Sequence, residues 1–197
     1  MLDDKKLKEA QSRVKRYLDN GAIKTKQQKE FVDFFLSNAE KSLNSANALY
    51  DLSTDKDMQH KTGYVNFDGF LWVVNAGYYS MFYMARALLE NEGIKIKSDL
   101  SVHAITFDAI INFFYLNGKL QKKIIEDFAD AKEEASELLG KQRADQLIED
   151  YFWEKGKRAI FTYNTKEIVI KAKAETSIDR AKRFNQEIKK IIKKYEK

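Results

Sequence analysis

Residues 70–93 constrain the fold of this chain more than any other feature of the sequence. They read FLWVVNAGYYSMFYMARALLENEG and form the most apolar and most aromatic run of the chain. As far as Leu89, only Asn75, Ser80 and Arg86 interrupt the apolar, aromatic and small side chains. On a helix, these bulky groups would point in almost every direction, which is typical of a helix that is buried on most sides.

A segment of this length could also cross a membrane, since a transmembrane helix needs about 20 apolar residues. The three polar side chains argue against that interpretation, and the tyrosines lie near the middle of the segment rather than at its ends, where membrane interfaces favour them. The chain also begins MLDDKKLKEA, which lacks the apolar core of a secretory signal. We therefore expect a cytoplasmic protein without a membrane segment.

The composition favours an all-α protein. The chain has 197 residues, no proline and eight glycines, so long helices can run without a proline break. Asn-Gly pairs, which favour tight β-hairpins, occur only at Asn20-Gly21 and Asn117-Gly118. There is no cysteine and there are two histidines, so we expect no disulfide and no structural zinc site. We predict one up-down helical bundle with no metal and no cofactor.

Apolar side chains that recur every three or four residues place the individual helices. The expected helical ranges are 2–19, 27–52, 70–93, 101–116, 120–140 with a continuation over 144–152, and 172–195. Residues 53–68 are polar and lack a helical period, so they are predicted to form a loop. Residues 161–170 have a strand-like pattern without an evident partner strand, and we expect a turn or loop there. Residues 1–24 form an N-terminal helical extension in this interpretation, and 25–197 form the main bundle.

Charge is divided unevenly along the chain. Residues 180–197 carry eight basic side chains against two acidic ones, and residues 126–150 carry nine acidic side chains against three basic ones. Two interpretations remain open. The basic segment could be a nucleic-acid-binding or solvated face, or an acidic helix could lie beside a basic one.

Three local patterns together resemble the HEPN domain, a small helical bundle found in prokaryotic toxin–antitoxin pairs and related proteins. The first is the run NAGYYSMF at 75–82 followed by ARALL at 85–89. The second is Gly93-Ile94 followed by Ser101-Val102-His103, where the family usually has a histidine that opens its next helix. The third is Arg158 and then Tyr163 before the last helix. The resemblance spans residues 27–195.

The resemblance implies a homodimer that acts on RNA, because ribonucleases of the family bring an arginine and a histidine from both protomers into one cleft. The arginine would hold the scissile phosphate and the histidine would move a proton, without a metal. In this chain Arg158 matches the arginine, but Tyr163 stands where the histidine is expected. A tyrosine with a pKa of about 10 is a poor base at neutral pH. The resemblance therefore implies weak or no nuclease activity.

The sequence offers six candidate site residues. Arg158 and Tyr163 are the candidate catalytic pair, with Lys157 and Asn164 as candidate ligand-binding neighbours. The structural alternative is that Arg158 pairs with an acid such as Glu154 or Glu167 and ties helices together.

His103 and Arg86 are further candidate ligand-binding residues. His103 could instead be an ordinary helix-start or core histidine. A buried Arg86 needs a partner, and we expect an ion pair with an acid from residues 126–134 or, alternatively, contact with a ligand phosphate. The tyrosines and phenylalanines of 78–83 are expected in the core. Any of these rings that stay exposed could form the contact between two protomers of a dimer.

The leading functional hypothesis is a HEPN-like protein of a toxin–antitoxin or defence system that engages RNA or a nucleotide. By resemblance, its partner is a small nucleotidyltransferase. Two alternatives stay open: a non-enzymatic protein-interaction module, and a metal-independent ribonuclease with an altered Arg158–Tyr163 site. Whether the protein is an enzyme is left open by the sequence.

Overall fold

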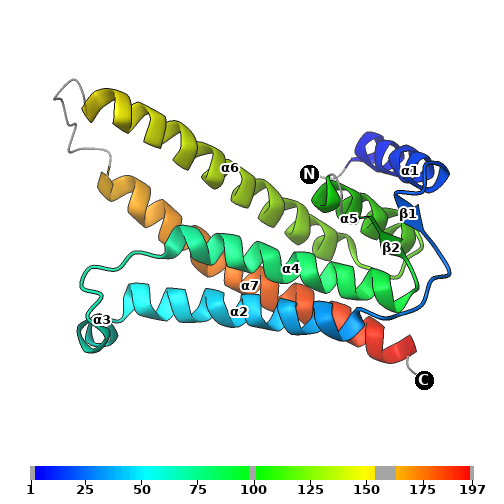
Figure 1. The fold of residues 1–197 in the computed structure, drawn as a ribbon, viewed down its shortest axis with the longest axis horizontal. Coiled ribbons are helices and arrows are strands. Elements are labelled where there is room, and N and C mark those ends of the chain that lie inside the picture. Colours follow the sequence, from blue (N-terminus) through cyan, green and yellow to red (C-terminus); the bar gives the residue numbers. More distant parts are fainter. Residues whose placement is uncertain (1–2, 98–100, 154–162, 196–197) are drawn as a thin grey trace.

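The computed structural model describes residues 3–97, 101–153 and 163–195, with side chains within 3–97, 101–138 and 170–194. The elements, in chain order, are α1 (Asp4–Asp19), β1 (Ile23–Lys24), α2 (Val32–Thr54), α3 (Lys56–Thr62), α4 (Phe70–Asn91), β2 (Lys95–Ile96), α5 (Val102–Ile110), the π-helical turn η1 (Ile111–Tyr115), α6 (Lys122–Trp153) and α7 (Tyr163–Tyr195). The all-α class is confirmed, and β1 and β2 add one short antiparallel ladder. Figure 1 shows the four long helices side by side.

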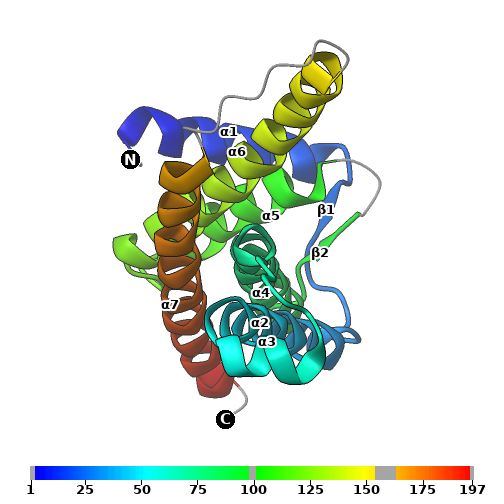
Figure 2. The same cartoon turned by 90° about the vertical axis from the view of Figure 1, so that its left-hand side faces the viewer.

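Helix α4 is the centre of the arrangement, as its sequence predicts. It packs against α2, α5, α6 and α7 (Figures 1 and 2) and buries most of its side chains. Ser80 is fully buried, and its hydroxyl donates to the carbonyl of Ala39 at 2.7 Å and accepts from the Asn185 amide at 2.8 Å. This polar side chain inside an apolar helix therefore fixes α4 between α2 and α7, because its hydrogen bonds remove the cost of burial.

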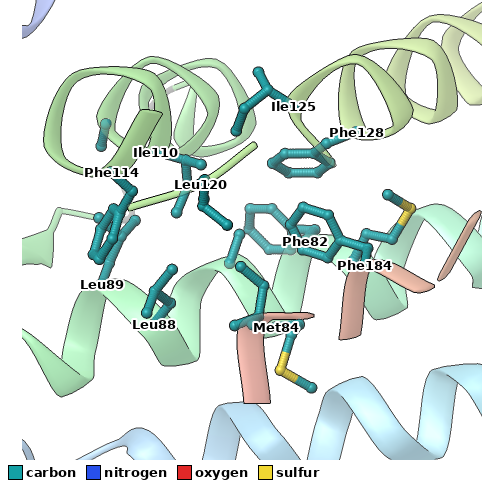
Figure 3. Close-up of a cluster of buried hydrophobic side chains, with 14 of the residues drawn as sticks. Phe82, Met84, Leu88, Leu89, Ile110, Phe114, Leu120, Ile125, Phe128 and Phe184 are labelled. Carbon is teal, nitrogen blue, oxygen red and sulfur yellow. The ribbon is translucent and has the colours of Figure 1, made fainter. Parts of the chain in front are cut away.

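The main hydrophobic core includes buried aromatic rings from α4, η1, α6 and α7 (Figure 3). Phe82 of α4, Phe128 of α6 and Phe184 of α7 are all buried there, and the last two rings have centroids 5.1 Å apart. Such ring pairs add about 0.5–1.5 kcal/mol beyond the burial of their area. None of the helices within the described ranges is long and apolar enough to cross a membrane.

Helix α1 packs against α5 and η1. The predicted apolar stripe faces this contact, with Ala10 and Val14 fully buried. Arg13 adds a two-pronged ion pair, in which its Nε and Nη2 donate to the Asp108 carboxylate at 2.7 and 2.8 Å. Because the Asp108 side chain is only 4% exposed, this pair is a specific, charge-assisted attachment rather than a surface contact.

The acidic segment and the basic segment lie side by side, as one of the two charge interpretations predicted. Arg180 of α7 donates to Glu134 of α6 at 2.8 Å, and Arg183 donates to buried Asp127 at the same distance. These contacts hold α6 against α7 in the described part of the two helices.

Two predicted boundaries are wrong. The predicted loop at 53–68 contains α3, whose first turn is capped by the Asp55 carboxylate accepting from the backbone N–H of Met58 at 3.0 Å. Buried Gln59 organises the rest, since its amide donates to the carbonyls of Leu52 and Phe67 and accepts from the N–H of Asn66. A seven-residue helix is too short to produce an apolar period, so pattern analysis missed it.

The second error concerns the start of the last helix. Residues from Tyr163 onward belong to α7, so the predicted turn or loop at 161–170 is wrong over that part. Its β-branched residues produce a strand-like pattern, but they disfavour a helix by well under 1 kcal/mol each, which context readily overrides. Helix α6 runs through Gly140 into the predicted continuation over 144–152.

Gly93, just after the end of α4, contacts the segment that precedes α2. Its φ is +67°, its carbonyl accepts from the N–H of Gln27 at 2.9 Å, and an added Cβ would lie 2.7 Å from the Gln27 carbonyl oxygen. Gly118 has the same kind of backbone, with φ +70°, but a Cβ there would have nothing within 4 Å. Alanine substitutions at the two glycines therefore distinguish the cost of backbone strain, present at both, from the cost of steric contact, present at Gly93 alone.

We expect Gly118→Ala to lower the free energy of unfolding by about 1 kcal/mol, the cost of a left-handed backbone for alanine. Gly93→Ala should lower it by about 3 kcal/mol, because overpacking against a backbone carbonyl adds its own cost. Urea denaturation followed by circular dichroism measures both. Equal losses for the two variants would show that the contact with Gln27 is not tight.

Candidate nucleic-acid interface

The Arg158 site predicted from the sequence is placed only in part. Lys157 and Arg158 lie outside the described residues. Tyr163 and Asn164 are the first two residues of α7, so this pair sits at the beginning of the last helix rather than before it. The assignment of these four residues to a site stays a prediction.

The expected ion pair of Arg86 with an acid of α6 is wrong. Its Nη2 lies 3.5 Å from the carbonyl oxygen of Ile96, and its guanidinium lies 4.8 Å from the centre of the Phe35 ring. The reason is geometric, since Arg86 is on the side of α4 that faces α2 and β2, whereas α6 packs against another side through Tyr78. Burial lowers the pKa of Arg86, partly offset by the nearby Glu90 carboxylate.

His103 lies in the first turn of α5, as a helix-start histidine would, and it is half-buried among rings of α4. Its Nδ1 is 2.8 Å from the Tyr78 hydroxyl, and its ring stacks on Phe82 with centroids 4.1 Å apart. Tyr79 meets it edge-on at 5.6 Å. Burial lowers the pKa of His103, and the positive charges of Lys132 and Arg86 lower it further.

One stripe of α4 is left partly uncovered, and it is aromatic. Trp72, Ala76, Tyr79, Tyr83 and Arg86 follow the three-and-four spacing of one helix face, and none of the five is fully buried. Trp72 is 54% exposed and Tyr79 is 40% exposed. In Figure 2, α7 and the β1–β2 ladder lie on opposite sides of α4.

Helix α2 extends this surface. Its Phe34 is 56% exposed and meets Phe35 with centroids 5.4 Å apart. Phe35 stacks on Tyr83 at 6.5 Å, and Tyr83 lies 6.2 Å from Tyr79. We call the five residues Phe34, Phe35, Trp72, Tyr79 and Tyr83 the aromatic face. Phe34, Phe35, Tyr83 and Tyr79 are joined by ring contacts, and Trp72 lies two turns before Tyr79 on the same side of α4. Phe34, Trp72 and Tyr79 are exposed, and exposed apolar patches can mark binding surfaces.

Lys132 is a further basic group, and its ring contact lies on α5 rather than on the aromatic face. It lies on α6, half-buried, with its Nζ 5.2 Å from the centre of the Phe107 ring, and burial lowers its pKa. Within the described residues, neither Lys132 nor Arg86 makes an ion pair. Sequence reasoning missed Lys132, Phe34 and Trp72. The spacing of 72, 76, 79, 83 and 86 was a usable signal, but it could not show which side of α4 stays open.

Comparison with protein-family models, with curated proteins and with solved structures found no match to this chain. Among the described residues, no three histidine, aspartate or glutamate side chains are grouped closely enough to hold a metal ion. The rings of this surface can stack on flat partners, and Arg86 beside them can attract anions.

The lowered pKa of His103 predicts how stability depends on pH. In the unfolded chain, the His103 imidazole takes up a proton near its ordinary pKa of 6.5. In the folded protein, it takes up that proton only at lower pH. His103 therefore contributes stability that is fully present above that value and is lost as pH falls through the folded pKa.

We expect the free energy of unfolding to fall more steeply below about pH 6.5 in the natural protein than in His103→Gln. Urea denaturation between about pH 8 and pH 5, which brackets the ordinary histidine pKa, measures the free energy of unfolding of both proteins. His60→Gln is the control, since it removes the other histidine and should leave the steeper fall in place. Parallel curves for the natural protein and His103→Gln would contradict the assignment.

Proposed function

We propose that this protein binds single-stranded RNA on the aromatic face and does not cleave it efficiently. The observation that carries the proposal is a partly exposed row of rings on α4 and α2, next to Arg86, which lacks a carboxylate partner among the described residues. Proteins that bind single strands combine these two features, with bases stacked on aromatic rings and basic groups along the phosphates.

Charge favours RNA over a second protein as the occupant of this face. Arg86 lies at one end of the α4 stripe, next to the β1–β2 ladder, which carries Lys24 and Lys95 as directly opposed residues. Lys95 is neutralised by Glu30 at 2.7 Å, whereas the contacts of Arg86 within the described part of the chain are with a backbone carbonyl and a ring. A guanidinium without a carboxylate partner in the described residues can attract the phosphates of RNA, and the exposed rings beside it can stack on its bases.

The wider setting is proposed from the resemblance carried by residues 75–89. It suggests a HEPN-like bundle, a homodimer, in a cytoplasmic toxin–antitoxin or defence system with a small nucleotidyltransferase as partner. Weak or absent cleavage is proposed because Tyr163 stands where the family's nucleases have a histidine, and an uncharged phenol is a poor proton acceptor near neutral pH.

The test is the binding of a fluorescent single-stranded RNA, followed by anisotropy. We expect Trp72→Ala and Tyr79→Ala each to weaken binding about tenfold, because stacking of one base contributes about 1–3 kcal/mol. Tyr79→Phe keeps the ring and should bind nearly as well as the natural protein. Trp72 and Tyr79 are exposed, but Tyr79 also contacts the buried rings of Tyr78 and Phe82, so circular dichroism checks that each variant keeps the fold.

Tyr64→Ala is the matched control, because Tyr64 is 61% exposed and lies outside the aromatic face. Binding that is absent, or that is weakened equally by Tyr64→Ala, would contradict the proposal.

A second outcome would assign the aromatic face to a contact between two copies of the chain. This outcome is self-association that Tyr79→Ala abolishes, with no binding of RNA. The same RNA should be recovered intact on a gel, and cleavage that disappears in Arg158→Ala would favour the ribonuclease alternative.

A further inference from the structure

The short β1–β2 ladder presents lysines on its outer face. Ile23 and Ile96 are directly opposed in the ladder and are both buried, and Lys24 and Lys95 form the next opposed pair. Successive side chains of a strand point to opposite faces. Because the isoleucines face the core, the two lysines lie together on the face that points away from it.

Lys97 belongs to the same outer face. Its backbone N–H donates to the carbonyl of Ala22 at 3.0 Å, which continues the antiparallel register by one residue pair. Lys97 lies two positions after Lys95, so its side chain leaves the strand on the same side. We call Lys24, Lys95 and Lys97 the basic ladder.

The charge of the basic ladder is only partly neutralised within the described residues. Lys95 lies 2.7 Å from the Glu30 carboxylate, whereas Lys24 and Lys97 are exposed and make no ion pair in the described part of the chain. Like charges directly opposite each other destabilise a pair of strands. An anion bound across the two strands would offset that repulsion.

Two contacts connect the basic ladder to the aromatic face. Arg86 Nη2 lies 3.5 Å from the carbonyl oxygen of Ile96 in β2, and its guanidinium lies 4.8 Å from the centre of the Phe35 ring. Lys95 Nζ lies 5.4 Å from the centre of the Phe31 ring, which is 50% exposed at the start of α2. The lysines therefore adjoin the rings where α2 begins and α4 ends (Figure 1).

We propose that Lys24 and Lys97 of the basic ladder bind the phosphates of the RNA strand whose bases stack on the aromatic face. This inference rests on the proposed RNA binding and names the element that takes the phosphates. Arg86 lies between the rings and the ladder and so borders both parts of the site. Surfaces that bind single strands have this arrangement, with stacking rings beside basic groups that follow the backbone.

A second copy of the chain is a poor partner for the basic ladder. In a two-fold dimer the same patch of each copy meets itself, so lysines would face lysines. A polyanion gains from each lysine instead, because every phosphate contact releases counterions. The lysines have one structural alternative, since charged side chains on a free strand edge prevent other strands from pairing with it.

The test measures the affinity of the full chain for a fluorescent single-stranded RNA as a function of salt. Lys24→Gln and Lys97→Gln should each reduce the slope of log affinity against log salt by about 0.7, and the double variant should reduce it by about 1.4, the values for one and two lost phosphate contacts with a single strand. Lys24→Arg keeps the charge and should keep the natural slope. Tyr79→Ala should weaken binding without changing the slope, because stacking involves no ion pair.

Lys182→Gln is the matched control for the lysine variants. Lys182 is exposed on α7 and makes no ion pair among the residues that the structure describes. In Figure 2, α7 and the ladder lie on opposite sides of α4, so this variant should keep the natural slope. A reduction equal to that of Lys24→Gln would mean that any lost charge lowers the slope, and would overturn the inference.

Inorganic polyphosphate supplies phosphates without bases and therefore tests the ladder alone. It should compete with RNA for the natural protein, and the Lys24→Gln/Lys97→Gln double variant should bind it more weakly, whereas Tyr79→Ala should bind it as the natural protein does. Polyphosphate binding that is the same in all three proteins would overturn the inference.

The failure of the inference is distinguishable from the failure of the proposed function. RNA binding that depends on Tyr79, with a salt slope unchanged by the two lysine substitutions, would overturn the inference, leave the proposed function standing and limit the lysines to protecting the strand edge. No RNA binding by the natural protein, or binding that depends on the lysines but not on Tyr79, would overturn both.

Discussion

The close approach of α4 and α7 at Gly77 is the contact on which the rest of the structure depends. A Cβ at Gly77 would lie 2.3 Å from the Ser177 hydroxyl oxygen and 3.3 Å from its backbone oxygen, so only glycine lets the helices come this near. Packing is sensitive at this scale, because protein interiors have few voids and little room for an added methyl group. With α7 held on one side and α2 on another, α4 is enclosed by helices and one stripe is left open.

That enclosure explains why structural and functional residues share one helix. The sides of α4 that meet α2, α6 and α7 carry buried side chains such as Phe82 and Ser80, whose roles are packing and hydrogen bonding. The remaining side carries Trp72 and Tyr79, which pack less and stay exposed. The same periodicity that builds the core thus presents a row of rings, with Arg86 at its end.

Much of the fold could be predicted from the sequence because its long helices carry strong apolar periods. The sequence predicted a buried helix over residues 70–93 and a helix over residues 2–19, and the structure has α4 and α1 there. The errors arose where the period was absent or misleading, as at α3, which is organised by the single buried side chain of Gln59.

The candidate interface was harder to predict, for a physical reason. Which side of α4 remains open depends on how its neighbouring helices pack, and no local pattern encodes that. The sequence predicted an acidic partner for Arg86, but Arg86 meets a ring and a backbone carbonyl. His103 lies by Phe82 and Tyr78 because α5 folds back over α4, an arrangement of two consecutive helices that no local pattern encodes.

The most direct measurement is photochemical crosslinking of the natural protein to a single-stranded RNA that contains 4-thiouridine, with the adducts located by mass spectrometry. If RNA is held on the aromatic face, adducts will concentrate on the residues of α4 and α2 that carry its rings, above all Trp72 and Tyr79. Adducts confined to the basic end of α7, around Lys190 and Lys194, would contradict the account and make the tail helix the RNA-binding surface.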